Sequence, residues 1–233
     1  MVTQTDGARV SDRVFRHLCQ AALSGRYEPG DKLPTQRQLA AELGVGMAPV
    51  REAVQRLEQL RIVEVRHGDG MRVADWRRDG GLDVIAHLLF GEGRPERELM
   101  GVLMEARRLV LVEVARLAAI RRSPEQAAAL ARIAAEMAEA PDARTAQLLD
   151  LAFFAEMVQA SGNLVFVLVM NSVRQVYLDW EEMFQPLVAE HRELAGHYRR
   201  AAVAVKAGRA ANAAAAVGRL AEIQESRLLA SLS

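Results

Sequence analysis

The chain has 233 residues, of which 51% are hydrophobic and 26% charged, and its 30 basic side chains balance its 30 acidic ones. This size allows one large domain or two small ones, and the zero net charge gives no electrostatic reason to expect a particular partner for the whole chain. The single cysteine, Cys19, excludes an intramolecular disulfide, and no apolar run marks a signal peptide or a membrane span, so we expect a cytoplasmic protein.

Helix signals dominate the first 60 residues. Apolar residues recur at helical spacing over 10–23, and a turn-rich connector follows. Thr35 is a good N-cap for a second helix, which Gly44 ends. A third helix begins near Pro49, where a missing N–H has no cost, and it presents one apolar face. That face consists of Val50, Ala53, Val54 and Leu57.

Beyond Leu60 the hydrophobic period changes from helix to strand. The runs RIVEVR and MRVAD surround HGDG, which predicts a tight β-hairpin. Two helices that meet at a small-residue corner, followed by a hairpin, describe a winged helix-turn-helix, whose second helix reads bases in the major groove. The alternative is an ordinary corner between two helices, which the hairpin with its basic tip disfavours. Residues 1–78 carry a net charge of +3, which also suits a polyanion.

The remainder of the chain, after a junction over 75–81, is Ala-rich and has the pattern of about seven helices and no strands. One of them begins at the capping box SPEQ, residues 123–126, with proline at the first helical position. The other expected helices cover 82–90, a long stretch from Pro95, 142–161, 164–184, 187–207 and 209–231.

The stretch LPTQRQLAAELGVGMAPVREAVQRLEQLRIVEVRHGDGMRV resembles the DNA-binding domain of the GntR family of bacterial transcription regulators, whose pattern is LP…R.LA..LGVSR.TVREAL..L…G.v....G.G..V. The rest resembles the FadR subfamily, through DW…GGLDVI and LLDLAFFAEMVQASGN. The resemblance implies a mostly α protein: a winged helix-turn-helix domain over 1–76, a linker over 77–83, and a six- or seven-helix ligand-binding and dimerisation bundle over 84–233. No nucleophile–base spacing or phosphate-binding loop appears, so we expect no enzyme.

The resemblance also implies which residues contact DNA. Arg37 and Arg51 match arginines that contact DNA, and His67 and Gly68 match the wing tip that enters the minor groove. Gly46 departs from the family pattern because it replaces a hydroxyl that holds a phosphate. The expected DNA-binding residues are Thr35, Gln36, Arg37, Gly46, Met47, Ala48, Arg51, His67 and Gly68.

Met47 stands where the family has an arginine that reads guanine. An arginine makes bidentate contacts to guanine, whereas a methionine cannot donate a hydrogen bond to a base edge and at most contacts a thymine methyl. We therefore expect an operator that differs from the familiar one, or weaker binding; loss of DNA binding is a third possibility.

One branch of the subfamily holds a divalent metal ion through an aspartate and three histidines. Asp150 matches the aspartate, but Phe154, Tyr198 and a position near Leu220 stand where that branch has histidine. Phenylalanine and leucine have no lone pair for a metal, and His197 is one residue out of register. We therefore expect neither a metal site nor a cofactor.

The acyl-CoA branch has phenylalanine and tyrosine at two of these positions, as this chain does. The resemblance implies an effector site formed by Arg107, Asp150, Phe154, Tyr177 and Tyr198. Arg107 lies on an otherwise apolar helix face and needs an anionic partner, either the effector or an internal carboxylate of Asp150 or Glu105. On the last helix, Ala221 and Gln224 do not clearly match that branch.

The leading hypothesis is a ligand-responsive transcription repressor or activator of fatty acid metabolism. It binds a palindromic double-stranded DNA operator as a homodimer, and its effector is a long-chain acyl-CoA or a fatty acid. Ligand binding shifts the helices packed on the linker and thereby the separation of the two recognition helices. The alternative is the same class of regulator with a small organic acid as effector, with or without a divalent metal. We expect a nucleoid-associated protein without a membrane partner.

Overall fold

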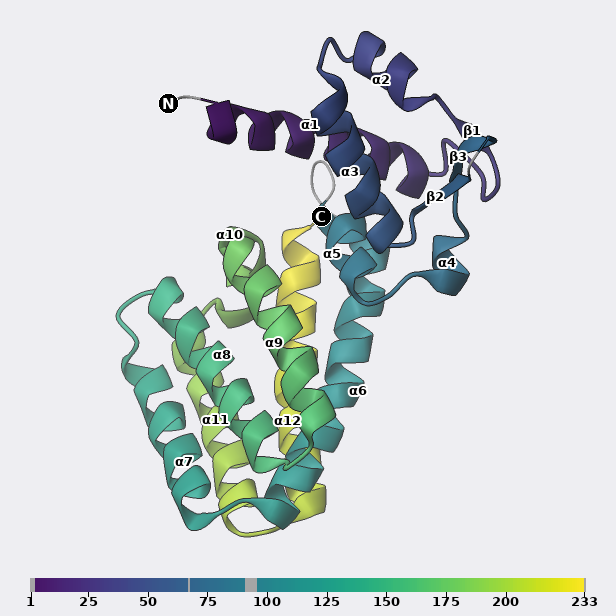
Figure 1. Cartoon of the computed structure of the whole chain (residues 1–233). Coiled ribbons are helices and arrows are strands. Elements are labelled where there is room, and N and C mark those ends of the chain that lie inside the picture. The colour runs from purple at the N-terminus through teal and green to yellow at the C-terminus, as the bar shows by residue number, and fades with distance from the viewer. Residues whose placement is uncertain (1–2, 67, 91–95, 233) are drawn as a thin grey trace. The chain divides into compact units, whose positions relative to one another are not determined.

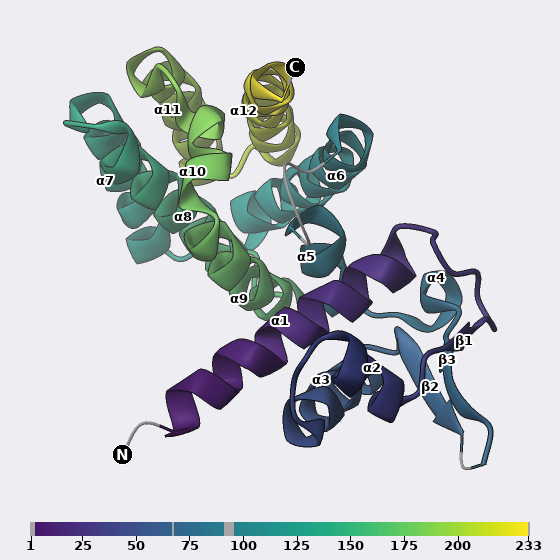
Figure 2. The same cartoon turned by 90° about the horizontal axis from the view of Figure 1, so that it is seen from above.

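The computed structural model describes the backbone of residues 3–66, 68–90 and 96–232 and the side chains of residues 10–66, 68–89 and 96–232. The chain divides into two compact units, Met1–Pro95 and Glu96–Ser233 (Figures 1 and 2). Within the described residues, no helix is long and apolar enough to cross a membrane. The expected fold class, a winged helix-turn-helix followed by a helical bundle, is confirmed.

The N-terminal unit begins with three helices: α1 (Thr3–Leu23), α2 (Gln36–Glu42) and α3 (Met47–Gln59). Helix α1 begins seven residues before the expected start, because the polar sequence ahead of Val10 continues the helix. Helices α1 and α3 pack against each other (Figure 2), and the predicted apolar face of α3 is buried. Arg56 of α3 ties them together, since its guanidinium lies 2.5 Å from Oδ1 of Asp12 and 4.1 Å from the ring centroid of Phe15.

A three-stranded antiparallel sheet closes this unit. Its order is β1 (Lys32–Leu33), β3 (Gly70–Val73), β2 (Val63–Arg66). The hairpin of β2 and β3 agrees with the prediction. Strand β1 was not predicted, because it lies in the connector for which the sequence indicates turns only. Pairing with Met71 of β3 makes Leu33 part of the core, because both side chains point to the buried face of the sheet.

Two short helices follow the wing: α4 (Trp76–Asp79) and α5 (Asp83–Phe90). The expected domain bounds place residues 84–90 with the C-terminal bundle, but α5 is part of the N-terminal unit. Val84 belongs to the core of that unit, and the rings of Phe15 and His87 meet edge to face at 5.0 Å.

The C-terminal unit is a helical bundle in which α12 packs along α6 and α11, and α11 also packs along α7 (Figure 1). Its long helices are α6 (Arg97–Arg121), α7 (Pro124–Glu139), α8 (Ala143–Ala160), α9 (Leu164–Asp179), α11 (His191–Lys206) and α12 (Ala210–Ser231). A short helix α10 (Glu181–Phe184) and a 3-10 turn η1 (Gln185–Val188) join α9 to α11. The predicted capping box at Ser123 is present: Gln126 accepts from the Ser123 amide and donates its own amide to the Ser123 hydroxyl.

One predicted helix, over 164–184, is wrong in its extent. Helix α9 ends at Asp179, and the chain bends at Trp180 before α10. In a continuous helix, residues seven apart lie about 10 Å apart along the axis. The bend instead brings Phe184 back onto Tyr177, with the two rings stacked at 5.2 Å. This ring contact within the bundle outweighs the continuous helical pattern of the sequence.

Candidate functional site

The corner between α2 and α3 depends on Gly44 and Gly46. Gly44 has a φ of 63°, in the left-handed region that favours glycine, and it ends α2 as predicted. Gly46 is the N-cap of α3 and offers no side chain to the free N–H groups of the first turn. A Cβ at Gly46 would lie 3.9 Å from Cδ of Pro49, so the position has room for the hydroxyl side chain of the family pattern.

The outward face of α3 carries the predicted base-reading residues. Ala48 and Arg51 are exposed and Met47 is half-buried. Within the described residues, Arg51 has no ion pair, so its guanidinium is available to a phosphate or a base. Glu52 and Gln55 are exposed on the same side of the helix. They were not among the predicted DNA-binding residues, although their spacing opposite the buried face of α3 identifies them as outward-facing.

The N-terminus of α2 is fixed by a capping box at Thr35. The Thr35 hydroxyl accepts from the Gln38 backbone amide at 3.3 Å, and the Thr35 amide donates to Oε1 of Gln38 at 2.8 Å. Arg37, in the first turn, is exposed, and Gln36 beside it is half-buried. The structure therefore gives Thr35 a role in helix capping, and it leaves the guanidinium of Arg37 in solvent.

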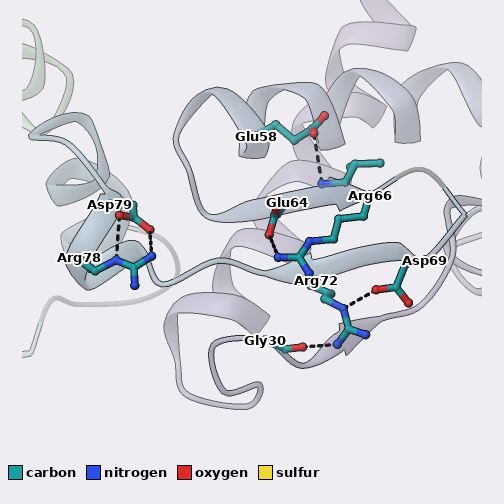
Figure 3. Close-up of polar contacts among 9 residues, drawn as sticks. Gly30, Glu58, Glu64, Arg66, Asp69, Arg72, Arg78 and Asp79 are labelled. Carbon is teal, nitrogen blue, oxygen red and sulfur yellow. Dashed lines mark hydrogen bonds and ion pairs between the residues drawn. The ribbon is translucent and has the colours of Figure 1, made fainter.

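The wing is braced by charges behind its tip. Asp69 lies 2.5 Å from Nζ of Lys32. It also lies 2.8 Å from Nε of Arg72, which donates to the carbonyl oxygen of Gly30 as well (Figure 3). Hydrogen bonds from Arg72 and Lys32 hold the pKa of Asp69 far below its ordinary value. Gly68 is exposed with a φ of 80°. His67, the other predicted wing-tip residue, lies outside the described residues.

A hollow of about 680 Å³ lies between the outer face of this hairpin and α4. Four arginines line it, and three of them have acidic partners: Arg66 pairs with Glu64, Arg72 with Asp69 and Arg78 with Asp79 (Figure 3). The fourth, Arg61, donates to the carbonyl oxygen of Asp79 at 2.9 Å. The positive charges around the hollow are thus largely compensated. The hydrogen bond of Arg61 joins α4 to the segment that directly follows α3.

The C-terminal bundle buries a polar cluster centred on Asp150 of α8. The Tyr198 hydroxyl donates to Oδ1 of Asp150 at 2.5 Å, and the Tyr177 hydroxyl donates to Oδ2 at 3.2 Å. Nε2 of Gln224 donates to Oδ1 at 2.7 Å. These donors come from three different helices, α9, α11 and α12, so the cluster ties the bundle together around one carboxylate.

Arg107 of α6 lies at the edge of this cluster. It donates to Oε1 of Gln224 at 2.9 Å, and its guanidinium lies 5.2 Å from the ring centroid of Phe154. Among the residues that the structure describes, no carboxylate lies within ion-pair distance of Arg107. The internal ion pair with Asp150 or Glu105, which the sequence left open, is therefore not formed.

Aromatic rings surround the cluster. Phe153 contacts Phe154 and Tyr198 edge to face, with centroids 5.6 and 5.1 Å apart. Burial raises the pKa values of the Tyr177 and Tyr198 hydroxyls well above the ordinary value, and the charge of Asp150 adds to this effect. Both hydroxyls therefore remain protonated and act as donors to Asp150.

The side chains around Asp150 do not fit the metal site of the metal-binding branch. Phe154 and Leu220 are buried and offer no donor atom, and Tyr198 is a protonated donor to Asp150. Among the described residues, no hydrogen bond links His197 to this cluster. In the described part of the chain, no group of three or more His, Cys, Asp or Glu side chains is placed to hold a metal ion.

Comparison with known proteins identifies both units. The model for bacterial regulatory proteins of the gntR family matches residues 10–73, and the model for the FCD domain matches residues 102–222. The HTH-type transcriptional regulator Mce2R of Mycobacterium tuberculosis is 33% identical over 223 residues, which cover 96% of this chain and 93% of Mce2R. The chain belongs to the GntR family. It is a DNA-binding transcription regulator with an effector-binding FCD domain, and not an enzyme.

More distant similarities agree with the assignment of this chain to the GntR family. The fatty acid metabolism regulator protein of Serratia proteamaculans is 27% identical over 161 residues, covering 69% of this chain and 66% of that protein. The solved structure of Lar, described as controlling the agr system of Listeria monocytogenes, superposes with a TM-score of 0.54 at 16% identity. That similarity covers 96% of this chain and 97% of Lar, and it supports the fold alone.

The FCD domain thus brings together all five predicted effector residues and adds one that the sequence analysis set aside. Gln224 is completely buried and bonds to Asp150, Tyr198 and Arg107. The sequence held a signal for it, because Gln224 follows Leu220 by four residues within the buried face of α12. A glutamine inside such a face has to find polar partners.

Proposed function

We propose that this GntR protein binds a palindromic operator as a homodimer in the cytoplasm, and that its FCD domain takes a long-chain acyl-CoA or a fatty acid beside Arg107. The observation that carries the effector proposal is the state of Arg107. A guanidinium has five N–H donors, and the hydrogen bond of Arg107 to a described residue goes to the neutral amide of Gln224. An anionic oxygen of a ligand is a stronger acceptor than an amide.

The surroundings of Arg107 support an effector with an apolar body. Phe154 lies against the guanidinium, and Phe153 and Tyr198 continue the aromatic surface inward. Helix α9, which supplies Tyr177, is the least embedded long helix beside them: Tyr177 is its only buried residue, and Leu164 is 69% exposed. Movement of α9 away from α8 would open space for an acyl chain at low cost in lost contacts.

Coupling to DNA follows from the position of Arg107 in the chain. It lies on α6, the first helix of the FCD domain after the DNA-binding unit. An anionic effector competes with Gln224 of α12 for the guanidinium, and the packing of α6 on α12 is the most extensive in the bundle. A changed α6–α12 contact therefore changes the helix with which the effector-binding unit begins. The effector acts through its different affinities for the two states.

Exposed apolar side chains support the homodimer. Helices α6 and α9 expose Val102, Leu109, Ile120, Val165 and Leu168. Such side chains on the surface of a bundle are typical of an interaction face. Two copies related by a two-fold axis would match the two halves of a palindromic operator.

A small organic acid is the second candidate effector, and the close ring contacts around Tyr198 favour it. A compact carboxylate could bind Arg107 at the edge of the cluster without separating Phe153 from Tyr198. Both candidates place an anionic group at Arg107, and they differ in whether the aromatic centre of the bundle opens.

Calorimetric titration tests the proposal and separates the candidates. Palmitoyl-CoA, palmitate and succinate are each titrated into EDTA-treated protein and into Arg107→Ala, with Arg132→Ala as a control in an exposed ion pair with Glu136. We expect wild type to bind about one palmitoyl-CoA or palmitate per chain. The same ligand should bind Arg107→Ala at least tenfold more weakly, and Arg132→Ala as tightly as wild type. Succinate binding alone would select the small-acid candidate, and equal binding by wild type and Arg107→Ala would contradict the role of Arg107.

A further inference from the structure

A second hollow lies on the outside of the FCD domain, along the α11–α12 pair, whose helices run side by side in Figures 1 and 2. Its volume is about 500 Å³, within the range of small-molecule sites. Arg199, Arg200 and Val203 of α11 line it, together with Asn212 of α12 and Arg209, the residue directly before α12. The residues of the Asp150 cluster do not contribute to its lining.

The charge of this hollow is uncompensated. Three arginines line it, and within the described part of the chain the side chains of Arg199, Arg200 and Arg209 form no ion pair or hydrogen bond; no carboxylate lines the hollow. The hollow beside the wing shows the contrast, because three of its four arginines have acidic partners there (Figure 3). Three unpaired guanidiniums around one hollow repel each other and favour an anion between them.

Neighbouring groups extend this positive potential. Arg209 is the N-cap of the 22-residue helix α12, and no side chain caps the N–H groups of the first turn, which adds the positive end of the helix dipole. An anion in the hollow would therefore meet guanidinium and backbone N–H donors together.

Part of the lining of the hollow is apolar. Its apolar lining consists of Val203, which is 60% exposed, together with Ala204, Ala207 and Ala216. An inorganic anion would leave this surface in water, whereas a ligand with a flat, weakly polar body would cover it. A second copy of the chain fits poorly, because a two-fold contact here would bring two arginine clusters together. A DNA backbone would contact the arginines but would not fill the hollow.

We propose that the α11–α12 hollow is a binding site for an organic phosphate of nucleotide type. Arg199, Arg200 and Arg209 hold the phosphates, and the Val203–Ala216 surface packs against the base. Because this hollow shares no residue with the Arg107 cluster, the nucleotide proposal does not depend on the proposed acyl effector. The regulator would thus bind a second small-molecule ligand besides the effector at Arg107.

Titration with ADP tests this site in the full-length protein. ADP, pyrophosphate and adenosine are titrated into wild type, Arg200→Ala/Arg209→Ala, Arg107→Ala and Arg132→Ala. All of these arginines except Arg107 are exposed, so their loss leaves the core intact. We expect one ADP per chain, at least tenfold weaker binding of pyrophosphate and adenosine, and at least tenfold weaker ADP binding to the double variant alone.

Three outcomes would overturn the proposal. The first is no saturable ADP binding. The second is ADP binding that Arg107→Ala weakens and the double variant does not, which would place the nucleotide at the effector site. The third is an unchanged ADP affinity in the double variant, which would exclude these arginines from an ADP site. The double variant could in addition bind a non-operator DNA duplex at least tenfold more weakly at fixed salt. That result would assign the arginines to the DNA backbone.

Discussion

The hydroxyl of Tyr198 donates a 2.5 Å hydrogen bond to Oδ1 of Asp150, inside a bundle where Tyr198 is completely buried and Asp150 is 2% exposed. The same carboxylate accepts from Tyr177 and Gln224, so three helices depend on one negative charge. A buried charge is stable only with such partners, and each donor in turn needs the carboxylate. The relationship makes Asp150 a structural centre as well as the neighbour of the proposed effector site.

Asp150→Asn is expected to destabilise the FCD domain by about 1–3 kcal/mol. The amide group would point N–H donors at hydroxyl and amide donors and leave buried hydrogen bonds unmade. Urea denaturation followed by circular dichroism measures the loss. Asp142→Asn is the matched control, because asparagine caps α8 as well as aspartate does. Equal stability of Asp150→Asn and wild type would contradict the cluster described above.

Alkaline pH is expected to destabilise the same domain. The pKa values of Tyr177 and Tyr198 are raised above 10 in the folded state, so unfolded chains lose these protons first as the pH rises. The stabilisation is complete below pH 10 and is lost progressively above it. Denaturation midpoints at pH 8 and pH 10.5 measure the fall, which Tyr198→Phe should reduce. A fall of the same size in Tyr198→Phe would show that Tyr198 does not cause it.

Arg61 combines an unusual backbone with a specific contact. Its φ of 57° lies in the left-handed region, where the family pattern has glycine, and its side chain donates to the carbonyl oxygen of Asp79. Arg61→Ala keeps the backbone cost and loses the contact, whereas Arg61→Gly loses both. We expect the glycine variant to be the more stable of the two by about 1 kcal/mol. Trp76 fluorescence during urea unfolding, in a Trp180→Phe background, reports on this unit; a less stable glycine variant would contradict the argument.

Met47→Arg is expected to change operator choice. The side chain at the start of α3 is half-buried beside the exposed Ala48 and Arg51, so an arginine there could reach a base edge. A bidentate contact to guanine discriminates by about 1–3 kcal/mol. Binding to operator variants with each base at every half-site position, at one fixed salt concentration, measures the change. A uniform gain across all variants would show that the new arginine contacts only phosphate.

The sequence predicted those parts of the fold that local chemistry determines. Thr35 was predicted as an N-cap and Ser123 as the start of a capping box, and both residues begin helices in this way; the capping box at Thr35 is an addition from the structure. The missed features depend on distant residues: β1 exists because Leu33 pairs with Met71, and α9 ends where Phe184 turns back to Tyr177. Such partners cannot be read from a local pattern.

The candidate site shows the same division. Similarity to the family suggested Arg107, Asp150, Phe154, Tyr177 and Tyr198, and the bundle brings these side chains together. Similarity to the family could not show that Arg107 bonds to Gln224 rather than to a carboxylate, because this contact depends on how α6 packs against α12. The DNA-binding roles of the exposed residues on α2 and α3 remain predictions.

We propose above that an anionic effector at Arg107 changes the affinity of the protein for operator DNA. The most direct test is fluorescence anisotropy of a labelled operator, selected from the DNA upstream of the gene, with and without palmitoyl-CoA. The account predicts at least a tenfold change in the dissociation constant for wild type and for Arg132→Ala, and none for Arg107→Ala. An unchanged dissociation constant in wild type at a palmitoyl-CoA concentration that saturates the protein would contradict it.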